Sequence, residues 1–294
     1  MSKPSFLCIG GQRCGTTRLH RILSAHPEIS MTTSGVGEFN KEIHYFDRFV
    51  LEKPLSWYEK HFKDSRFSGE ITPAYSTLNK ASVESIKQYL PSSKVLFIVR
   101  DPLDRIWSQI RMMKSGWSQN LIGNEMDLYS LVNLFDSPAV ELRSDYLRTF
   151  LLWRKAYGDH SFLTLSFNEL LSRAGLVKLF KFLGISESWM PSNEVSKKVL
   201  ASPSLKLPSE LRWLYVNRWS TMLKSFAAYY PDALIWLNQI LIDENNNMPP
   251  YFLDRIREIR QSQAESTLTK WRESNLYYDS LSMALASRLD KASA

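Results

Sequence analysis

The strongest constraint on the fold is a glycine-bearing loop between an apolar run and a helical pattern near the N-terminus. The apolar residues 6–9 lead into the loop at residues 10–17, whose sequence is GGQRCGTT. Apolar residues then recur at helical spacing as far as His26 and Pro27. A strand, a glycine loop and a helix in this order place backbone N–H groups and the positive end of a helix dipole at one point. The loop therefore predicts an anion site that suits phosphate or sulfate.

A second unit of the same kind follows. Residues 94–99 are a continuous β-branched and aromatic run, typical of a strand buried on both faces of a parallel sheet. The run ends at Arg100, and Asp101 followed by Pro102 predicts a helix from about residue 103 to residue 113. Further strands are predicted at 67–71 and 161–167, and further helices at 56–61, 82–89 and 144–157. This alternation predicts an α/β, P-loop-like, three-layer fold with a central parallel sheet flanked by helices.

Composition limits the partners and the location. The 294 residues carry 37 Lys and Arg against 30 Asp and Glu, a formal charge of +7, which favours acidic ligands such as nucleotides or sulfated glycans. The basic residues are scattered, so we expect no nucleic acid partner. Cys8 and Cys14 have the spacing of neither a metal site nor a disulfide framework. No pattern in the sequence indicates an oligomeric state.

No stretch approaches the roughly 20 apolar residues of a membrane span, and the strand pattern starts at Phe6, which leaves no room for a signal peptide. We therefore expect a reduced, cytoplasmic protein without a membrane span, unless an anchor has been removed. Residues 245–250 look like a linker. They predict one domain at residues 1–245 and a polar, helical C-terminal extension at residues 246–294.

The loop at residues 10–17 has the length of the triphosphate-binding loop GxxxxGK[ST] but lacks its Lys. Thr16 stands where that loop needs Lys for the β and γ phosphates. The cation is Arg13 instead, where it can reach a terminal anionic group on a donor with a single 5′ phosphate. This argues against an ordinary ATPase or kinase. A P-loop small-molecule kinase and a catalytically inactive nucleotide-binding protein remain the alternatives, beside a glycine turn that only packs a strand against a helix.

With this loop, the Arg100-Asp101-Pro102 turn and Ser108, the chain resembles the sulfotransferase family. It is most similar to the branch of heparan sulfate N- and 3-O-sulfotransferases and their bacterial homologues, from about residue 6 to about residue 184. The resemblance implies that the donor is 3′-phosphoadenosine 5′-phosphosulfate, that the product is adenosine 3′,5′-bisphosphate, and that no metal is needed. It implies that the 5′-phosphosulfate binds to loop residues Gln12, Arg13, Cys14, Gly15, Thr16 and Thr17.

The resemblance also assigns the donor's 3′ phosphate to Arg100 and to Ser108, eight positions further on. The physical chemistry agrees, because Arg presents a planar fork of donors that fits a phosphate, and the carboxyl end of a strand is where open α/β sheets bind ligands. Either residue alone would more often be structural. A basic loop that closes over the donor is expected near Lys197 and Lys198 or near Lys206.

Residues 41–47 resemble the family's stretch of a Glu, a His two positions on, and aromatic residues. The resemblance makes Glu42 the general base, which takes the proton of the acceptor hydroxyl as the sulfur–oxygen bond forms. His44 lies on the same side of an extended segment and either orients Glu42 or is itself the base. The implied reaction is in-line sulfuryl transfer to an acceptor hydroxyl or amine of a carbohydrate or small metabolite, with Arg13 stabilising the leaving oxygen.

One departure from the family concerns the acceptor. Residues 69–75 resemble the family's Glu-Lys-Thr-Pro-Ala-Tyr stretch, but Ile71 replaces the Lys that lies near donor and acceptor in the glycosaminoglycan enzymes. This weakens the expectation of a heparan-type acceptor. Lys41 and Arg13 are the two candidates to supply the missing charge.

Overall fold

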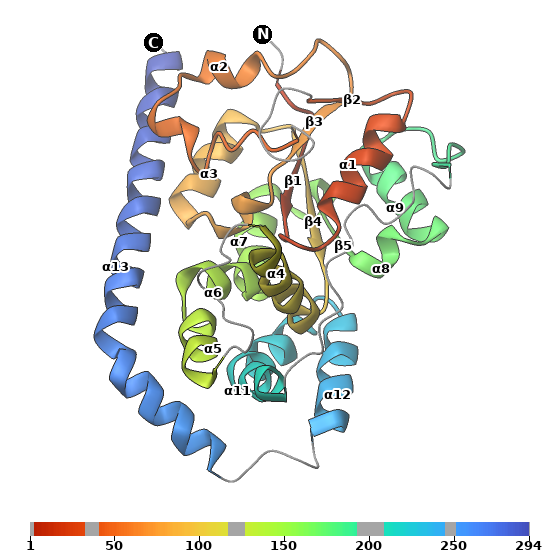
Figure 1. The fold of residues 1–294 in the computed structure, drawn as a ribbon. Coiled ribbons are helices and arrows are strands. Elements are labelled where there is room, and N and C mark those ends of the chain that lie inside the picture. The colour runs from red at the N-terminus through yellow and green to blue at the C-terminus, as the bar shows by residue number, and fades with distance from the viewer. Residues whose placement is uncertain (1–2, 33–40, 117–126, 193–208, 245–250, 294) are drawn as a thin grey trace. The chain divides into compact units, whose positions relative to one another are not determined.

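The computed structural model describes residues 3–32, 41–116, 127–192, 209–244 and 251–293 (Figure 1). The chain forms two compact units, each assembled from separate stretches of sequence. The first unit contains residues 1–100, 149–200 and 276–294, and the second contains residues 101–148 and 201–275. Every strand among the described residues belongs to the first unit.

A five-stranded parallel sheet forms the centre of the first unit. Its strands are β1 (Phe6–Gly10), β2 (Ser30–Met31), β3 (Ser68–Ile71), β4 (Lys94–Val99) and β5 (Phe162–Ser166). Their order is β2-β3-β1-β4-β5, and each neighbouring pair is parallel. In register, Leu7 of β1 lies between Glu70 of β3 and Val95 of β4. The predicted parallel α/β fold is confirmed, and only the two-residue edge strand β2 lacks a counterpart among the predictions.

Helices cover both faces of the sheet (Figure 1). One face packs against α1 (Thr16–Ala25), α8 (Phe167–Leu170) and α9 (Arg173–Leu183), in a core that includes Cys8, Leu19, Ile98, Leu165 and Phe180. The other face packs against α3 (Lys80–Tyr89) and residues 149–157 of α7 (Tyr146–Tyr157). There the ring centroid of Phe150 lies 5.6 Å from that of Phe162. Alternate residues of each strand point to opposite faces, so both layers are apolar and the strands are buried.

Short elements connect the strands and helices of this unit. They are η1 (Phe49–Leu51), α2 (Leu55–Glu59), η2 (Pro73–Thr77) and η3 (Asp159–Ser161). Of these, η2 follows β3 directly, so it begins at the carboxyl edge of the sheet, beside the end of β1.

The second unit is helical in its described part. It contains α4 (Pro102–Gly116), α5 (Leu128–Phe135), α6 (Pro138–Ser144), α11 (Ser209–Phe226), α12 (Asp232–Glu244) and the first part of α13 (Phe252–Ser293). The rings of Phe135 and Trp219 pack at 5.1 Å, and Arg260 of α13 donates two hydrogen bonds to Asp136, of 2.8 and 3.0 Å. Within the described ranges, no helix has both the length and the apolar character that crossing a membrane requires.

The long helix α13 continues into the first unit. There Leu281, Leu285 and Leu289 are buried, and the hydroxyl of Tyr277 donates a 2.6 Å hydrogen bond to the backbone carbonyl of Asp47. The helix predicted for the C-terminal segment is therefore present, and it packs against the 41–47 segment. The domain boundary near residue 245 lies outside the described residues and stays a prediction.

Candidate functional site

The predicted anion loop lies at the carboxyl edge of the sheet, after the central strand β1. The chain leaves β1 towards β2 on one side, whereas it leaves the adjacent strand β4 towards β5 on the other side. Adjacent strands whose connections depart in opposite directions form a topological switch point, which is where open α/β sheets bind ligands. The loop that follows β1 and Arg100, which follows β4, are the two sides of this switch point. The structure therefore brings two of the predicted donor contacts to one place.

The loop turns tightly before α1. The N–H of Gly11 donates to the carbonyl of Ile98 in β4, and the N–H of Cys14 donates to the carbonyl of Gly11 at 3.2 Å. Arg13 has a φ of 66°, in the left-handed region, and Gly15 precedes α1 with a φ of 86°. Helix α1 begins at Thr16 and has no acidic residue in its first turn. The positive end of its dipole and its first N–H groups thus favour an anion.

Gly15→Ala should lower the free energy of unfolding by about 1–3 kcal/mol, because the left-handed backbone and a steric clash act together. A Cβ at this position would lie 2.7 Å from the ring of Phe167. Urea unfolding of wild type and variant measures the cost. Gly184→Ala is the matched control, since Gly184 lies in the same left-handed region, with a φ of 83° and a ψ of 31°, and no atom lies closer than 3.8 Å to the added Cβ. Equal costs in the two variants would show that the contact with Phe167 is not responsible.

Arg100 is held by the same aromatic ring. Its guanidinium carbon lies 5.0 Å from the ring centroid of Phe167, the first residue of α8. Such stacking fixes the plane of a guanidinium, whose edge carries paired donors that fit a phosphate. Phe167 therefore contacts both sides of the switch point, the loop at Gly15 and Arg100. The sequence does not predict this role, because an aromatic residue after a strand is usually core.

The predicted contacts of Ser108 and of the closing basic loop stay predictions. Ser108 lies in α4, is 5% exposed and belongs to the second unit, so its partnership with Arg100 stays a prediction. Lys197, Lys198 and Lys206, the candidates for a closing basic loop, lie outside the described residues.

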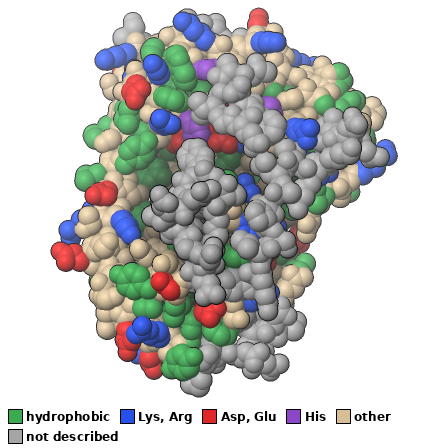
Figure 2. All heavy atoms as spheres, in the orientation of Figure 1, with side chains coloured by type: hydrophobic (Ala, Val, Ile, Leu, Met, Phe, Trp, Pro, Cys, Tyr) green, Lys and Arg blue, Asp and Glu red, His purple; other side chains and the backbone are tan. Residues whose placement is uncertain are grey.

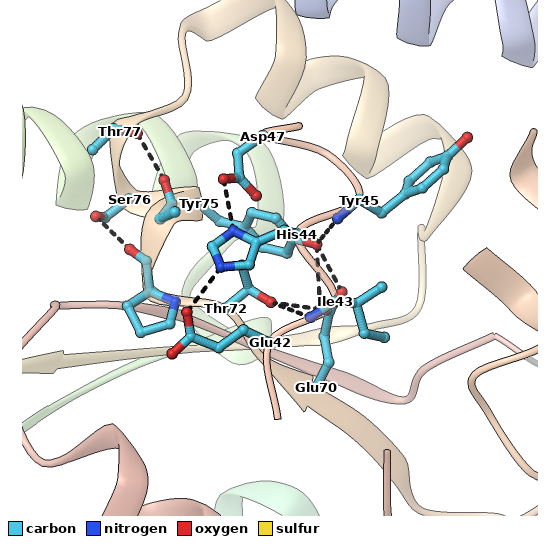
Figure 3. A network of polar contacts seen from close by, with 12 residues as sticks. Glu42, Ile43, His44, Tyr45, Asp47, Glu70, Thr72, Tyr75, Ser76 and Thr77 are labelled. Atoms are coloured by element: carbon cyan, nitrogen blue, oxygen red, sulfur yellow. Dashed lines mark hydrogen bonds and ion pairs between the residues drawn. The ribbon is translucent and has the colours of Figure 1, made fainter. Parts of the chain in front are cut away.

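Three polar side chains of the 41–47 segment form a hydrogen-bonded chain (Figure 3). Nε2 of His44 is 3.0 Å from Oε2 of Glu42, and Nδ1 of His44 is 2.8 Å from Oδ2 of Asp47. On the face drawn in Figure 2, a histidine side chain lies directly beside acidic side chains. The structure thus joins Glu42 to His44, on which the sequence prediction depends, and adds Asp47, which the sequence does not predict. Its only signal is an acidic residue three positions after a histidine.

The contacts within this hydrogen-bonded chain of side chains set the charges of His44 and Glu42. Burial disfavours the protonated form of His44, but the hydrogen bonds to Asp47 and Glu42 outweigh it and raise the pKa of His44 to about 9. Burial likewise disfavours the ionised form of Glu42, yet the hydrogen bond from His44 and the charge of Lys41 hold its pKa below the usual value. At neutral pH a protonated His44 therefore donates from both nitrogens, and Glu42 is ionised.

We expect the His44 ring to titrate near pH 9, which two-dimensional NMR of the imidazole resonances measures. Because this pKa lies above the usual 6.5, the stability that His44 contributes is complete below pH 6.5 and is lost as the pH rises through 9. Asp47→Asn should lower the pKa by removing the charged acceptor. Asp64→Asn, at an exposed position, should not change it. A wild-type titration near 6.5 would contradict the hydrogen-bonded chain.

A buried cation lies beside Glu42. Lys41 is 5% exposed, and its ammonium group donates to Oε1 of Glu42. Its charge also reaches Cys8 in β1, where burial raises the pKa of the thiol to about 12 and Lys41 partly opposes the rise. Ile71, at the position of the family's Lys, is a fully buried core residue. Of the two candidates for the missing charge, Lys41 is thus in contact with the predicted base.

Comparisons with known proteins identify the family of this chain. The model of the family described as "Sulfotransferase domain" matches residues 3–215. The membrane-associated sulfotransferase kil1 of Dictyostelium discoideum is 32% identical over 112 residues, which are 36% of this chain and 22% of that protein. The human bifunctional heparan sulfate N-deacetylase/N-sulfotransferase 2 is 24% identical over 208 residues, 62% of this chain and 22% of that protein. The chain thus spans about a fifth of the length of these curated relatives.

A solved structure has the same fold. The sulfotransferase from Alicyclobacillus acidocaldarius superposes with a TM-score of 0.56 at 16% sequence identity, and the match covers 84% of this chain and 98% of that one. The family model spans all five strands of the described sheet, and also the loop after β1, the 41–47 segment and Arg100. With the fold, the loop and the sequence match in agreement, the chain belongs to the sulfotransferase family.

Proposed function

We propose that this protein transfers a sulfuryl group from 3′-phosphoadenosine 5′-phosphosulfate to an acceptor hydroxyl or amine, with Glu42 as the general base. The observation that carries the proposal is the ionised Glu42 carboxylate, held between a protonated His44 and the buried Lys41. A carboxylate in this state can take a proton from an acceptor that is losing one. The family supplies the reaction type, and the site supplies a group able to perform its proton transfer.

The residues at the switch point fit this donor. The first turn of α1 has no acidic side chain to repel an anion, Arg13 adds a cation to the loop, and Arg100 presents a guanidinium fixed by Phe167. Thr16, at the first position of the helix, is not the Lys that a triphosphate requires. Arg13 with the N-terminus of α1 stabilises the charge that grows on the leaving phosphate oxygen.

His44 serves as the orienting residue rather than as the base. With its pKa raised to about 9, its ring carries a proton on each nitrogen at neutral pH and has no lone pair to accept another. Its hydrogen bond to Glu42 fixes the direction of the carboxylate, and Asp47 fixes the ring in turn. Lys41, in contact with the other carboxylate oxygen, adds a positive charge that helps to keep Glu42 ionised.

The acceptor is a hydroxyl or amine of a carbohydrate or small metabolite. The name of the human relative specifies heparan sulfate N-sulfation for that protein. Support for a carbohydrate acceptor comes from that relative. The buried Ile71 in place of a Lys argues against a heparan-type chain as the acceptor.

Calorimetry with adenosine 3′,5′-bisphosphate, compared with ATP and Mg²⁺, tests the donor. We expect the bisphosphate to bind more tightly, because the loop lacks the Lys that holds a triphosphate. Tighter binding of ATP with Mg²⁺ would overturn the proposal and favour a kinase. Radiolabelled donor and a panel of hydroxyl and amine acceptors then test transfer, and donor binding without transfer to any acceptor would favour a binding protein.

A further inference from the structure

A second carboxylate lies directly beneath the 41–47 segment and has no part in the proposed chemistry. Glu70, in β3, is 0% exposed. Its carboxylate accepts hydrogen bonds from the hydroxyls of Tyr58 at 2.6 Å, Thr72 at 2.7 Å, and Tyr75 at 3.1 and 3.2 Å (Figure 3). Among the described residues no cation forms an ion pair with it. Burying a carboxylate on hydroxyl donors alone is costly, so its presence calls for an explanation.

Two of these hydroxyls also hold the backbone of the 41–47 segment. The Thr72 oxygen accepts from the N–H of Ile43 at 3.1 Å, and the Tyr75 oxygen accepts from the N–H of Tyr45 at 3.1 Å. A hydroxyl has a single hydrogen. Because each hydrogen is donated to Glu70, only lone pairs remain to face the two N–H groups. Glu70 therefore orients both hydroxyls so that their lone pairs face the N–H groups of the segment.

The two anchored N–H groups flank the proposed catalytic residues. Ile43 lies between Glu42 and His44, and Tyr45 follows His44. His44 itself has a φ of 54°, in the left-handed region that a non-glycine residue rarely occupies unless its surroundings impose it. The hydrogen bonds on both sides of His44 are such surroundings.

We propose that Glu70 is a positioning residue, whose carboxylate acts through Thr72 and Tyr75 to hold the 41–47 backbone so that Glu42 meets His44. This inference rests on the proposed function for its effect on the reaction, but the anchoring itself is a property of the fold.

The protonation state of Glu70 makes the anchoring of the 41–47 backbone depend on pH. Burial raises its pKa to about 7 against the three hydroxyl hydrogen bonds, and the nearby charge of Asp47 adds to the rise. The other titratable groups that face it are Tyr58 and Tyr75, whose own pKa values are raised by burial, so they stay protonated. Protonation of Glu70 below pH 7 brings in an extra hydrogen and forces one hydroxyl to turn. Since this pKa is above the usual 4.5, the stability from Glu70 is complete below pH 4.5 and is lost as the pH rises through 7.

The test compares Thr72→Val with Thr72→Ser, and Glu70→Gln with Glu59→Gln. Val has the shape of Thr without the hydroxyl, whereas Ser keeps it. Glu59 accepts a 2.8 Å hydrogen bond from Tyr89 and therefore matches Glu70 as a tyrosine-bonded carboxylate, but Tyr89 lies outside the 41–47 segment and η2. The first readout is amide hydrogen exchange of Ile43 and Tyr45 by NMR, with the amides of β4 as the internal reference.

We expect Thr72→Val to accelerate exchange at Ile43, Glu70→Gln to accelerate it at both amides, and Thr72→Ser and Glu59→Gln to leave both unchanged. In Thr72→Val and Glu70→Gln, kcat for sulfuryl transfer should fall by about 10- to 100-fold, as expected when a reacting group is misplaced. The affinity of both variants for adenosine 3′,5′-bisphosphate should stay constant. In the wild type, kcat should fall as Glu70 is protonated below pH 7, and Glu70→Gln should not show this step.

The outcomes separate this inference from the proposed function. Unchanged exchange at both amides in Glu70→Gln and Thr72→Val would overturn the positioning role, whatever the activity. Should Glu70→Gln fail to fold, the Thr72 pair decides alone, since Val and Ser differ at one hydroxyl. If Glu42→Gln keeps full activity, the proposed base is wrong, and the exchange experiment still tests the anchoring.

Discussion

Glu42→Gln should lower kcat for sulfuryl transfer by about 1000-fold, within the range that a general base contributes, while donor affinity stays within about twofold. The amide has the shape of the carboxylate but cannot take a proton from the acceptor. The amide also keeps an oxygen that can accept a hydrogen bond from His44 or Lys41, so one of these hydrogen bonds can still form. The measurement is single-turnover transfer at saturating donor, with calorimetry of adenosine 3′,5′-bisphosphate on the same preparation.

Glu52→Gln is the control for this variant, because Glu52 is an exposed carboxylate a short distance along the same stretch of chain, after η1. It should transfer at the wild-type rate. Wild-type kcat in Glu42→Gln would remove Glu42 from the mechanism. A loss of donor affinity together with kcat would instead show that the substitution had disturbed the loop.

Arg100→Ala should weaken binding of adenosine 3′,5′-bisphosphate by about 100-fold, because a charged, paired hydrogen bond to a phosphate is lost. The loss should be specific to the 3′ phosphate. Adenosine 5′-monophosphate lacks that group, so its affinity should fall by about twofold or less in the same variant. Calorimetry with both ligands, on both proteins, measures the four affinities needed for the comparison.

Arg66→Ala is the matched control for Arg100. The guanidinium carbon of Arg66 lies 4.9 Å from the ring centroid of Phe67, a stacking geometry close to that of Arg100 on Phe167, but Arg66 is exposed and precedes β3 rather than following β4. Its removal should leave both affinities unchanged. If Arg100→Ala lowers the affinity for both ligands equally, Arg100 does not contact the 3′ phosphate. If neither affinity changes, Arg100 is not part of the donor site.

Local patterns were sufficient for the elements that position the donor site. The glycine loop, the apolar run at 94–99 and the helix start after Arg100 were each predicted from a few adjacent residues, and Asp101 accepts a 2.8 Å hydrogen bond from the N–H of Leu103, as a helix cap does. The edge strand β2, with only two residues, is too short for a periodic pattern to predict. Helices α11 and α12 were not predicted either, and tertiary packing commonly decides such segments.

The 41–47 segment makes contacts that the sequence alone could not predict. The short spacing of Glu42 and His44 made their meeting predictable, but the expectation of an extended segment was wrong at His44, whose φ is 54°. Nothing near them in the sequence points to Thr72 or Tyr75, which lie 29 and 30 positions from the N–H groups that they accept. Those contacts exist because β3 lies next to β1 in the sheet, and η2 follows it at the same edge.

For this protein, the sequence by itself determined the α/β fold and the strand, loop and helix that carry the predicted anion site, because these depend on backbone preferences and on spacings of a few residues. Glu42 was proposed as the base from the family resemblance. Only the tertiary structure decided that Lys41 contacts Glu42, that Phe167 contacts both sides of the switch point, and that the buried Glu70 anchors the 41–47 backbone. The physical reason is that burial and hydrogen bonding between distant strands set these charges and directions, and both depend on which strands become neighbours.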